Sequence, residues 1–310
     1  MENYTLITGG FGFVGYNLVN KLSKLGKKII VVDNLYNTCV KEISEDVLFF
    51  ELDLSKKASL IVLDPFKIDL IFHLAAQSSN ATSFNDPIED LNYNQIATYN
   101  LLEYAANRKI TRFIYTSSMS VYGNIDNHPT TESIEKKPDS FYAIHKLVGE
   151  YYCDVFRSYM GVNFTIFRLF SVYGHGQNIK NLDQGLLSIY IGYILNGKEL
   201  IVKGSGERER DIIHVEDVTD VLIKSINNKK TFNQIYNLGF GKTLKIKTII
   251  NLLLKVFDKV DFPVKYEKGT KGDPLKTQAD ITKLKKDLDW TPKISPIDGV
   301  TSTAIEHKKS

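Results

Sequence analysis

The stretch Thr8-Gly9-Gly10-Phe11-Gly12-Phe13-Val14-Gly15 decides the fold, because it joins a short apolar segment to an amphipathic one. Residues 4–7 before it have the composition of a buried parallel strand. Residues 14–25 after it carry apolar side chains at helical spacing, and Gly26 ends them. The glycines at 9, 12 and 15 permit a tight turn and close approach of the backbone to a pyrophosphate. The helix N-terminus then presents free N–H groups and a positive dipole end to phosphates.

Asp33 lies at the end of the next apolar segment, residues 28–32. A carboxylate at this point accepts hydrogen bonds from ribose hydroxyls and repels a 2′-phosphate, which favours NAD over NADP. The alternative interpretation is a glycine-rich turn that binds no ligand. The coincidence of turn, context and acid favours a dinucleotide site.

Strands and helices alternate outward from this motif. The predicted strands are residues 4–7, 28–32, 47–51, 70–73, 112–116 and 163–169, and the predicted helices of this half are 14–25, 90–107 and 140–160. Near-continuous apolar strands in such alternation predict an α/β fold with a doubly wound parallel sheet.

The second half is less regular. Helices are expected at residues 184–196, 215–226, 245–257 and 280–288, and strands at 200–203 and 234–238, the second of which could rejoin the large sheet. We expect one domain from residues 1–174 plus about 211–241, and a smaller α/β substrate-binding domain from about 175–210 plus 242–310.

Composition limits the classes of protein that remain. The 310 residues are 43% hydrophobic and 24% charged with a net charge of +3, which is ordinary for a globular protein. The basic residues are scattered, so nucleic acid is not an expected partner. We expect no signal peptide and no membrane span. Cys39 and Cys153 as free thiols suit a reducing, cytoplasmic location, and the spacing of His, Cys and Asp suggests no metal site.

Tyr142 and Lys146 stand four residues apart on a predicted helix, so both side chains can point into one site. A free phenol is a poor base at neutral pH. A nearby lysine cation favours the phenolate, which can then accept a proton from a substrate hydroxyl. Ser118 follows the fifth strand, where its hydroxyl can bond the reacting oxygen. The alternative for this common Tyr/Lys spacing is a surface pair on a helix.

Further motifs, in order along the chain, make the sequence resemble the extended short-chain dehydrogenase/reductases that modify nucleotide sugars. They are Asp33-Asn34-Leu35, Asp53-Leu54, His73-Leu74-Ala75-Ala76-Gln77, Asn94, Ser117-Ser118, Val121-Tyr122-Gly123, Tyr142 with Lys146, Arg168, Val172-Tyr173-Gly174 and Arg210-Asp211. Within that family, Asp33-Asn34-Leu35 is most similar to the UDP-galactose 4-epimerases. The resemblance covers nearly the whole chain and implies a Rossmann-type sheet with NAD as cofactor.

The resemblance also implies roles for single residues. The implied cofactor-binding residues are Gly9, Gly12, Phe13, Val14, Gly15, Asp33, Asn34, Asp53, Leu54, Leu74, Ala75, Ala76, Gln77, Asn94, Thr116, Tyr142 and Lys146. The implied substrate-binding residues are Ser118, Ser171, Lys203, Arg210 and Asp273, with Arg210 on the substrate pyrophosphate. The alternative for Arg210 is a surface arginine paired with Asp211 or Glu207.

Departures from the family pattern narrow the reaction. Met119 and Ser120 replace the Asp-Glu pair of the 4,6-dehydratases, and Met119 also replaces the cysteine of the C3/C5 reductase–epimerases. Ser171 and Lys203 stand where asparagine and an aromatic residue are usual, which leaves the nucleotide base and the sugar open.

The resulting hypothesis is NAD-dependent oxidation at C4 of a nucleoside-diphosphate sugar, a UDP-hexose or a GDP-sugar or heptose. The enzyme is then a 4-epimerase, or a 4-dehydrogenase if the keto sugar leaves, with catalytic residues Ser118, Tyr142 and Lys146. A 4-ketosugar reductase is the alternative enzyme. A non-catalytic NAD-binding sensor is the alternative from another class. The resemblance implies a homodimer formed through the helices near residues 90–107 and 140–160.

Overall fold

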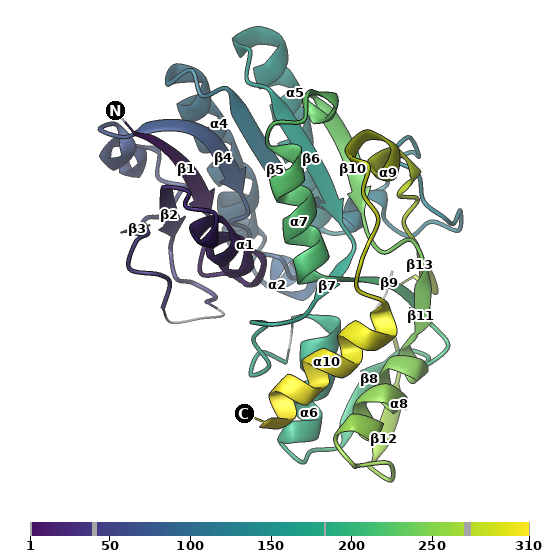
Figure 1. The fold of residues 1–310 in the computed structure, drawn as a ribbon. Helices are drawn as coiled ribbons and strands as arrows, with labels where there is room; N and C mark the ends of the chain where they lie inside the picture. Colours follow the sequence, from purple (N-terminus) through teal and green to yellow (C-terminus); the bar gives the residue numbers. More distant parts are fainter. Residues whose placement is uncertain (1, 39–41, 183, 270–273, 310) are drawn as a thin grey trace.

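The structure is a computed structural model that describes residues 2–38, 42–182, 184–269 and 274–309. A seven-stranded sheet with strand order β10-β6-β5-β4-β1-β2-β3 forms its larger part (Figure 1). Neighbouring strands are parallel throughout this sheet. The strands are β1 Asn3–Thr8, β2 Ile29–Asp33, β3 Leu48–Glu51, β4 Lys67–His73, β5 Arg112–Ser118, β6 Phe164–Leu169 and β10 Gln234–Leu238. The predicted α/β class and doubly wound sheet are therefore confirmed.

Alternating side chains of each strand enter two separate cores. Leu6 and Ile30 belong to one core, whereas their neighbours Ile7 and Val31 belong to the other. Successive side chains of a strand point to opposite faces of the sheet, and helices cover both faces. This double burial explains why the strands are almost continuously apolar.

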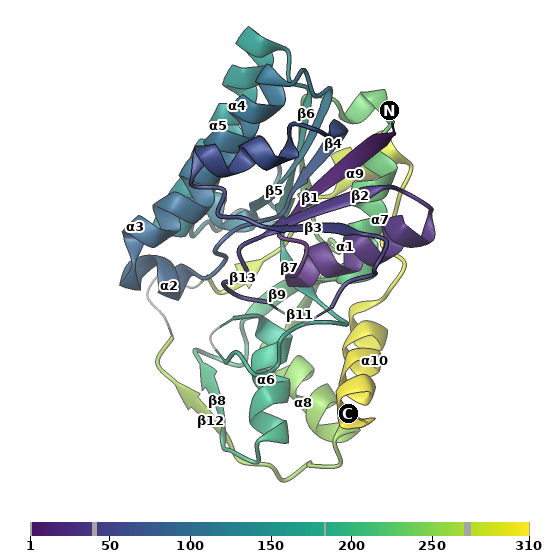
Figure 2. The ribbon, with the colours of Figure 1, turned by 90° about the vertical axis from the view of Figure 1, so that its left-hand side faces the viewer.

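Helices on the two faces come from different parts of the chain (Figures 1 and 2). One face carries α1 Phe13–Lys24, α7 Val215–Ser225 and α9 Thr282–Leu288. The other carries the 3₁₀ segment η1 Lys57–Leu63, the π-helical segment η2 Leu91–Ile96, and the helices α4 Ala97–Asn107 and α5 Phe141–Met160. The short helices α2 Asn80–Asn85 and α3 Pro87–Asp90 precede η2, the 3₁₀ turn η3 Met119–Tyr122 follows β5, and η4 Lys229–Thr231 precedes β10.

The single helix predicted over residues 90–107 is wrong in detail. Asp86 caps α3 by accepting a hydrogen bond from the Glu89 N–H at 2.8 Å, and Pro87 occupies the first turn. Proline is favoured there because its missing N–H would be unpaired in any case. The helical stretch therefore begins before Asp90, and it changes to π-helical turns at Leu91 before α4 begins.

The smaller part of the molecule lies below the sheet in Figure 1 and has its own apolar core. It contains α6 Leu186–Leu195, α8 Ile246–Val256 and α10 Pro296–Lys309, and the parallel pair β8 Leu200–Lys203 with β12 Val264–Glu267. A small sheet of β11 Thr243–Lys245, β9 Glu209–His214, β13 Lys276–Thr277 and β7 Ser171–Tyr173 lies between the two parts.

The predicted domain division stays a prediction. Helix α9 falls in the range assigned to the smaller domain, yet Leu284 and Leu288 pack into the core beneath the large sheet. None of the described helices has the length and apolar character needed to cross a membrane.

Candidate active site

Two glycines of the turn have no room for a side chain. Gly9 has φ +72°, and a Cβ there would lie 2.7 Å from the Ala75 nitrogen. A Cβ on Gly15 would lie 2.0 Å from the Gly9 carbonyl oxygen. Gly12 is the N-cap of α1, and no side chain accepts hydrogen bonds from the first N–H groups of this helix. Gly12 and Gly15 line a cavity, so the N-terminus of α1 borders that cavity. These features fit a pyrophosphate held at the helix N-terminus.

Asp33 ends β2 at the bottom of a cavity beside this turn. Its carboxylate accepts hydrogen bonds from the N–H groups of Phe11 and Leu35, each at 2.9 Å. Burial raises the pKa of Asp33, and these backbone bonds oppose that shift. A partly buried carboxylate next to an open cavity is suited to two ribose hydroxyls, which would replace lost hydration.

The remaining residues predicted for the adenosine half gather around the same cavity. Among its lining residues are Asn34, Asp53, Leu54, Leu74, Ala75, Ala76 and Gln77, together with Tyr36, Asn37 and Tyr93, which sequence reasoning did not single out. Asn100 was also missed. The Asn100 side-chain nitrogen donates to the Leu54 and Ser55 carbonyls, both at 2.9 Å. These bonds hold the segment of the cavity lining that contains Leu54.

His73 holds the loop that follows β4 in place through a chain of hydrogen bonds. The Ala75 N–H donates to the Thr8 hydroxyl at 3.2 Å, and that hydroxyl bonds His73 Nδ1 at 2.8 Å. His73 Nε2 bonds the Thr98 hydroxyl at 2.8 Å, which itself donates to the Asn94 carbonyl. Because the Thr98 hydroxyl donates to Asn94, His73 Nε2 must carry a proton in this chain of hydrogen bonds. Burial, with Lys146 nearby, lowers its pKa to about 3.

Asn94 is buried in η2 and lies outside the lining of both large cavities. Its side-chain nitrogen donates to the Gln77 carbonyl and to Asp90 Oδ1, each at 2.9 Å. The structure therefore places Asn94 behind the cofactor loop, as a support for Gln77.

Ser118, Tyr142 and Lys146 line one cavity. Ser118 ends β5, and the other two lie on the first turns of α5, which Ser140 caps by accepting from the Ala143 N–H at 3.2 Å. The same cavity is lined by Gly12, Phe13, Val14, Gly15 and Thr116. Strand β5 and helices α1 and α5 thus bring the predicted triad beside the predicted pyrophosphate turn.

Burial acts on both ionisable members of this group. It raises the pKa of Tyr142 to about 12, while a hydrogen bond with Ser118 opposes the shift. It lowers the pKa of Lys146 to about 8, against the attraction of Asp90 and Glu150. The Lys146 ammonium also lies 4.7 Å from the centre of the Tyr115 ring, a distance at which the ring face attracts a cation.

A buried ion pair joins β6 to α5, the helix that carries Tyr142 and Lys146. Arg168 on β6 donates from Nε and Nη2 to the two Glu150 oxygens at 2.9 and 2.6 Å. Ser117 donates to Glu150 Oε1 at 2.6 Å, and Arg168 also donates to the Tyr122 hydroxyl at 2.9 Å. Sequence reasoning named Arg168 without a partner and missed Glu150. The available signal was an acid one turn after Lys146 on the same helix face.

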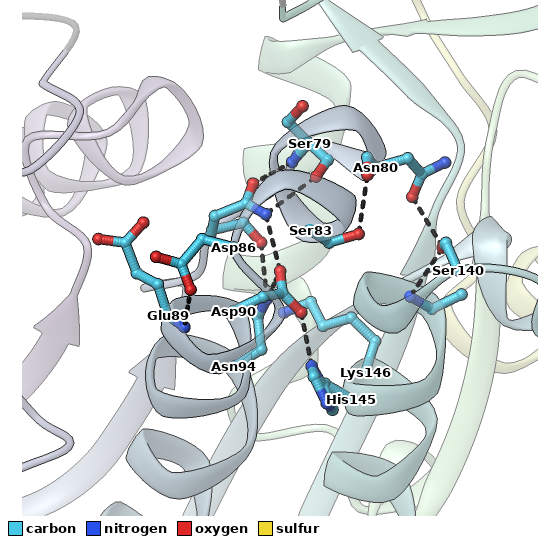
Figure 3. A network of polar contacts seen from close by, with 12 residues as sticks. Ser79, Asn80, Ser83, Asp86, Glu89, Asp90, Asn94, Ser140, His145 and Lys146 are labelled. Atoms are coloured by element: carbon cyan, nitrogen blue, oxygen red, sulfur yellow. Dashed lines mark hydrogen bonds and ion pairs between the residues drawn. The ribbon is translucent and has the colours of Figure 1, made fainter. Parts of the chain in front are cut away.

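A second buried network connects the loop that follows β4 to α5, the helix that carries Tyr142 and Lys146 (Figure 3). Gln77 donates to Asp90 Oδ1 at 2.7 Å, and Asp90 Oδ2 contacts His145 Nδ1 at 2.5 Å. Ser140 also donates to Asn80 Oδ1 at 3.0 Å, which ties the start of α5 to α2. Asp90 and His145 had not been singled out from sequence.

Amide side chains are numerous in the lining of the same cavity. Its lining includes the predicted Ser171 and, in addition, Ser78, Asn80, Gln177, Asn178, Asn181 and Gln184. Gln184 accepts from Asn37 at 2.6 Å and donates to Ser78, so it bridges the two halves of the molecule. Amides and hydroxyls can each donate and accept, which suits them to sugar hydroxyls.

The other predicted substrate residues lie elsewhere or cannot be placed. Lys203 is exposed at the end of β8, and Arg210 lies on β9; neither lines the cavity of the triad. Arg210 is buried, so the alternative of a surface arginine is wrong. Asp273 lies outside the described residues. In the part of the chain that the structure describes, no group of three or more His, Cys, Asp or Glu side chains could hold a metal ion.

Comparisons with known proteins agree with this geometry. The UDP-glucose 4-epimerase of Mycolicibacterium smegmatis is 29% identical over 96% of each chain. The structure of the Thermotoga maritima UDP-glucose 4-epimerase with UDP-glucose is 32% identical, with a TM-score of 0.94 over 99% of each chain. The Thermus thermophilus UDP-glucose 4-epimerase in complex with NAD is 25% identical, with a TM-score of 0.89 over 99% of each chain.

The model of the NAD dependent epimerase/dehydratase family matches residues 5–239. That range includes the glycine turn, Asp33 and the triad. The predicted resemblance, the Rossmann-type sheet and the predicted cofactor, NAD, are thereby confirmed. The chain is an enzyme that belongs to the NAD-dependent epimerase/dehydratase family.

Proposed function

We propose that this enzyme oxidises C4 of a nucleoside-diphosphate sugar with NAD and returns the hydride to the opposite face, as a sugar-nucleotide 4-epimerase. The observation that carries the proposal is the meeting of Ser118, Tyr142 and Lys146 in one cavity with the N-terminus of α1. Met119 and Ser120 line that cavity next to Ser118. Neither residue has a carboxylate for eliminating water, so oxidation at one carbon is the chemistry that the site favours.

Tyr142 is the proposed acid–base group. Its phenolate accepts the proton of the C4 hydroxyl, and Ser118 bonds the same oxygen. When bound, NAD supplies the hydride acceptor. Because burial holds the pKa of Tyr142 near 12, the phenolate needs a positive charge nearby, and Lys146 one helical turn away carries one. A pKa of about 8 for Lys146 keeps that charge in place at neutral pH.

The cofactor would lie with its adenosine beside Asp33 and Asp53 and its pyrophosphate at Gly12 and Gly15. The amide-rich wall then receives the sugar. We retain Arg210 as the residue for the substrate pyrophosphate, together with Lys203 and Asp273, although their assignment rests on the family resemblance. The names of the M. smegmatis and T. maritima relatives support epimerisation of a UDP-sugar over net dehydrogenation.

We also propose that a second copy of the chain packs against α4 and α5. Tyr99, Tyr151 and Val155 expose apolar surface along these helices, and the Tyr159 side chain is 85% exposed. Sedimentation velocity should give a dimer, and Tyr151→Glu should shift the protein towards the monomer. A cytoplasmic location is part of the same proposal, since Cys153 is a free thiol.

The test uses purified NAD-loaded protein and a panel of UDP-, GDP- and dTDP-sugars, heptoses included. Product stereochemistry by NMR and nicotinamide absorbance are followed together. A C4 epimer without a net absorbance change supports epimerisation and identifies the base. A free 4-keto sugar with one equivalent of reduced cofactor indicates a dehydrogenase. No reaction across the panel would refute the proposal.

A further inference from the structure

Asp90 is a fully buried carboxylate that faces the back of the active site, with 0% of its surface exposed. It ends α3, directly before η2. Three side-chain N–H groups point at its oxygens: Gln77 Nε2 at 2.7 Å, Asn94 Nδ2 at 2.9 Å and His145 Nδ1 at 2.5 Å (Figure 3). Charge-assisted hydrogen bonds of this kind stabilise the ionised form of a carboxylate.

His145 holds Asp90 from the catalytic helix. It lies on α5 between Tyr142 and Lys146, is itself buried, and its ring stacks with Phe141 at 6.5 Å between centres. Because the carboxylate can only accept, His145 Nδ1 must carry a proton in this contact. The Asp90–His145 pair therefore fixes the distance between the end of α3 and the turn of α5 that presents the triad.

The opposite side of Asp90 reaches the cofactor loop. Gln77 bonds Asp90 through its side chain, while its backbone carbonyl accepts from Asn94 at 2.9 Å. Gln77 Nε2 also donates to the Ser79 carbonyl at 2.9 Å, so the whole turn after Ala76 is held on Asp90. One carboxylate thus connects the wall of the adenosine cavity with the helix of Tyr142 and Lys146.

The charges that face Lys146 come from several elements. Asp90 from α3 and Glu150 from α5 itself raise its pKa against the effect of burial. Arg168 neutralises Glu150 in a bidentate pair, and His73 on β4 is neutral. Asp90 also raises the pKa of Tyr142. Asp90 is therefore the acid whose charge acts on both ionisable members of the triad.

We propose that Asp90, oriented by His145, is a positioning residue whose hydrogen bonds hold the loop after Ala76 against the turn of α5 that presents Tyr142 and Lys146, and whose negative charge acts on both of these side chains. Asp90 and His145 would influence the protonation of Tyr142 and Lys146 without contacting substrate. The proposal rests on the proposed function where it assigns the two limbs of a pH–rate profile to Tyr142 and Lys146.

The test is Asp90→Asn, which removes the charge and nearly preserves the volume. Because Asp90 raises the pKa of both Tyr142 and Lys146, its loss should lower both. The acidic and alkaline limbs of kcat should then move together to lower pH, by about one pH unit. A merely structural role would instead lower the rate and the melting temperature without moving either limb.

A substrate-free readout separates this proposal from the proposed function. Tyr142 is titrated in the NAD-loaded protein by its phenolate absorbance, as the difference between each protein and its Tyr142→Phe counterpart. The midpoint should fall by about one pH unit in Asp90→Asn. A shifted midpoint in a protein that turns over no sugar would overturn the proposed function and leave this inference standing.

Three further variants complete the design. His145→Asn keeps an N–H donor close to the position of Nδ1, so its titration midpoint should match that of the unmodified protein, whereas His145→Leu removes the donor and should shift the midpoint. Asp154→Asn removes an exposed charge from the same helix and should move nothing. If Asp90→Asn does not fold, the comparison of His145→Asn with His145→Leu still tests the proposal. Equal midpoints in all folded variants would overturn the proposal.

Discussion

Replacing Gly15 by alanine should abolish tight NAD binding while leaving the fold intact. An added Cβ would lie 2.0 Å from the Gly9 carbonyl oxygen, 2.8 Å from its carbonyl carbon and 2.9 Å from the Gly10 Cα. All three are backbone atoms, so no side chain can rotate away. Reaching ordinary contact at 3.4 Å requires the turn and the start of α1 to separate by more than an ångström.

That displacement is enough to break the hydrogen bonds expected between the first N–H groups of α1 and the pyrophosphate. Each bond to a charged group contributes about 1.5–3 kcal/mol. Loss of two such bonds, at the lower value, amounts to about 3 kcal/mol, which corresponds to a roughly 100-fold rise in Kd.

Isothermal titration calorimetry with NAD measures this change directly. Gly26→Ala is the matched control, because Gly26 follows the same helix, has φ +70° and would place its Cβ with nothing within 4 Å. It should cost about 1–2 kcal/mol of stability through its left-handed backbone and leave Kd unchanged. A Gly15→Ala protein that binds NAD within a few-fold of the original would refute the assignment of this turn to the pyrophosphate.

Three further changes test other parts of the site. Glu150→Gln leaves the Arg168 guanidinium buried without its anion and should lower the free energy of unfolding by about 3–5 kcal/mol in urea denaturation; an unchanged midpoint would contradict the structural role of the pair. His73 has a pKa of about 3 in the fold and about 6.5 when unfolded, so the unfolded chain binds its proton first and stability is lost as pH falls from about 6.5 towards 3. Between pH 7 and pH 4.5 this loss is about 2–3 kcal/mol, and His73→Asn should show a correspondingly shallower decline than the original protein, with equal slopes counting against a neutral His73. Asp33→Asn should weaken NAD binding about 10-fold and reduce the preference for NAD over NADP, as read from the two dissociation constants; an unaltered preference would remove Asp33 from the ribose site.

Features confined to one strand–turn–helix unit could be predicted from sequence. The glycine turn, Asp33 and the Tyr142/Lys146 spacing each depend on neighbours a few residues away, and local geometry determines where they point. The sheet could be predicted for the same reason, because burial on both faces makes each strand continuously apolar.

Contacts between distant residues could not be predicted in this way. Arg168 and Glu150 meet across β6 and α5, and Asp90 and His145 meet across α3 and α5. Each pairing depends on how helices pack on the sheet, which no single segment encodes. The place of α9 beneath the large sheet is a similar case, since an amphipathic helix shows that it packs but not on which core.

The central claim, reversible hydride transfer at C4 with Tyr142 as the base, is tested most directly with a sugar nucleotide deuterated at C4. The NAD-loaded protein is incubated with the member of the panel that it turns over, and the product is analysed by NMR. The account predicts inversion at C4 with the deuterium retained on that carbon and no net change in nicotinamide absorbance. Tyr142→Phe should bind NAD normally and lose turnover by about 100-fold or more. Inversion at another carbon, exchange of the deuterium with solvent, or an active Tyr142→Phe protein would contradict it.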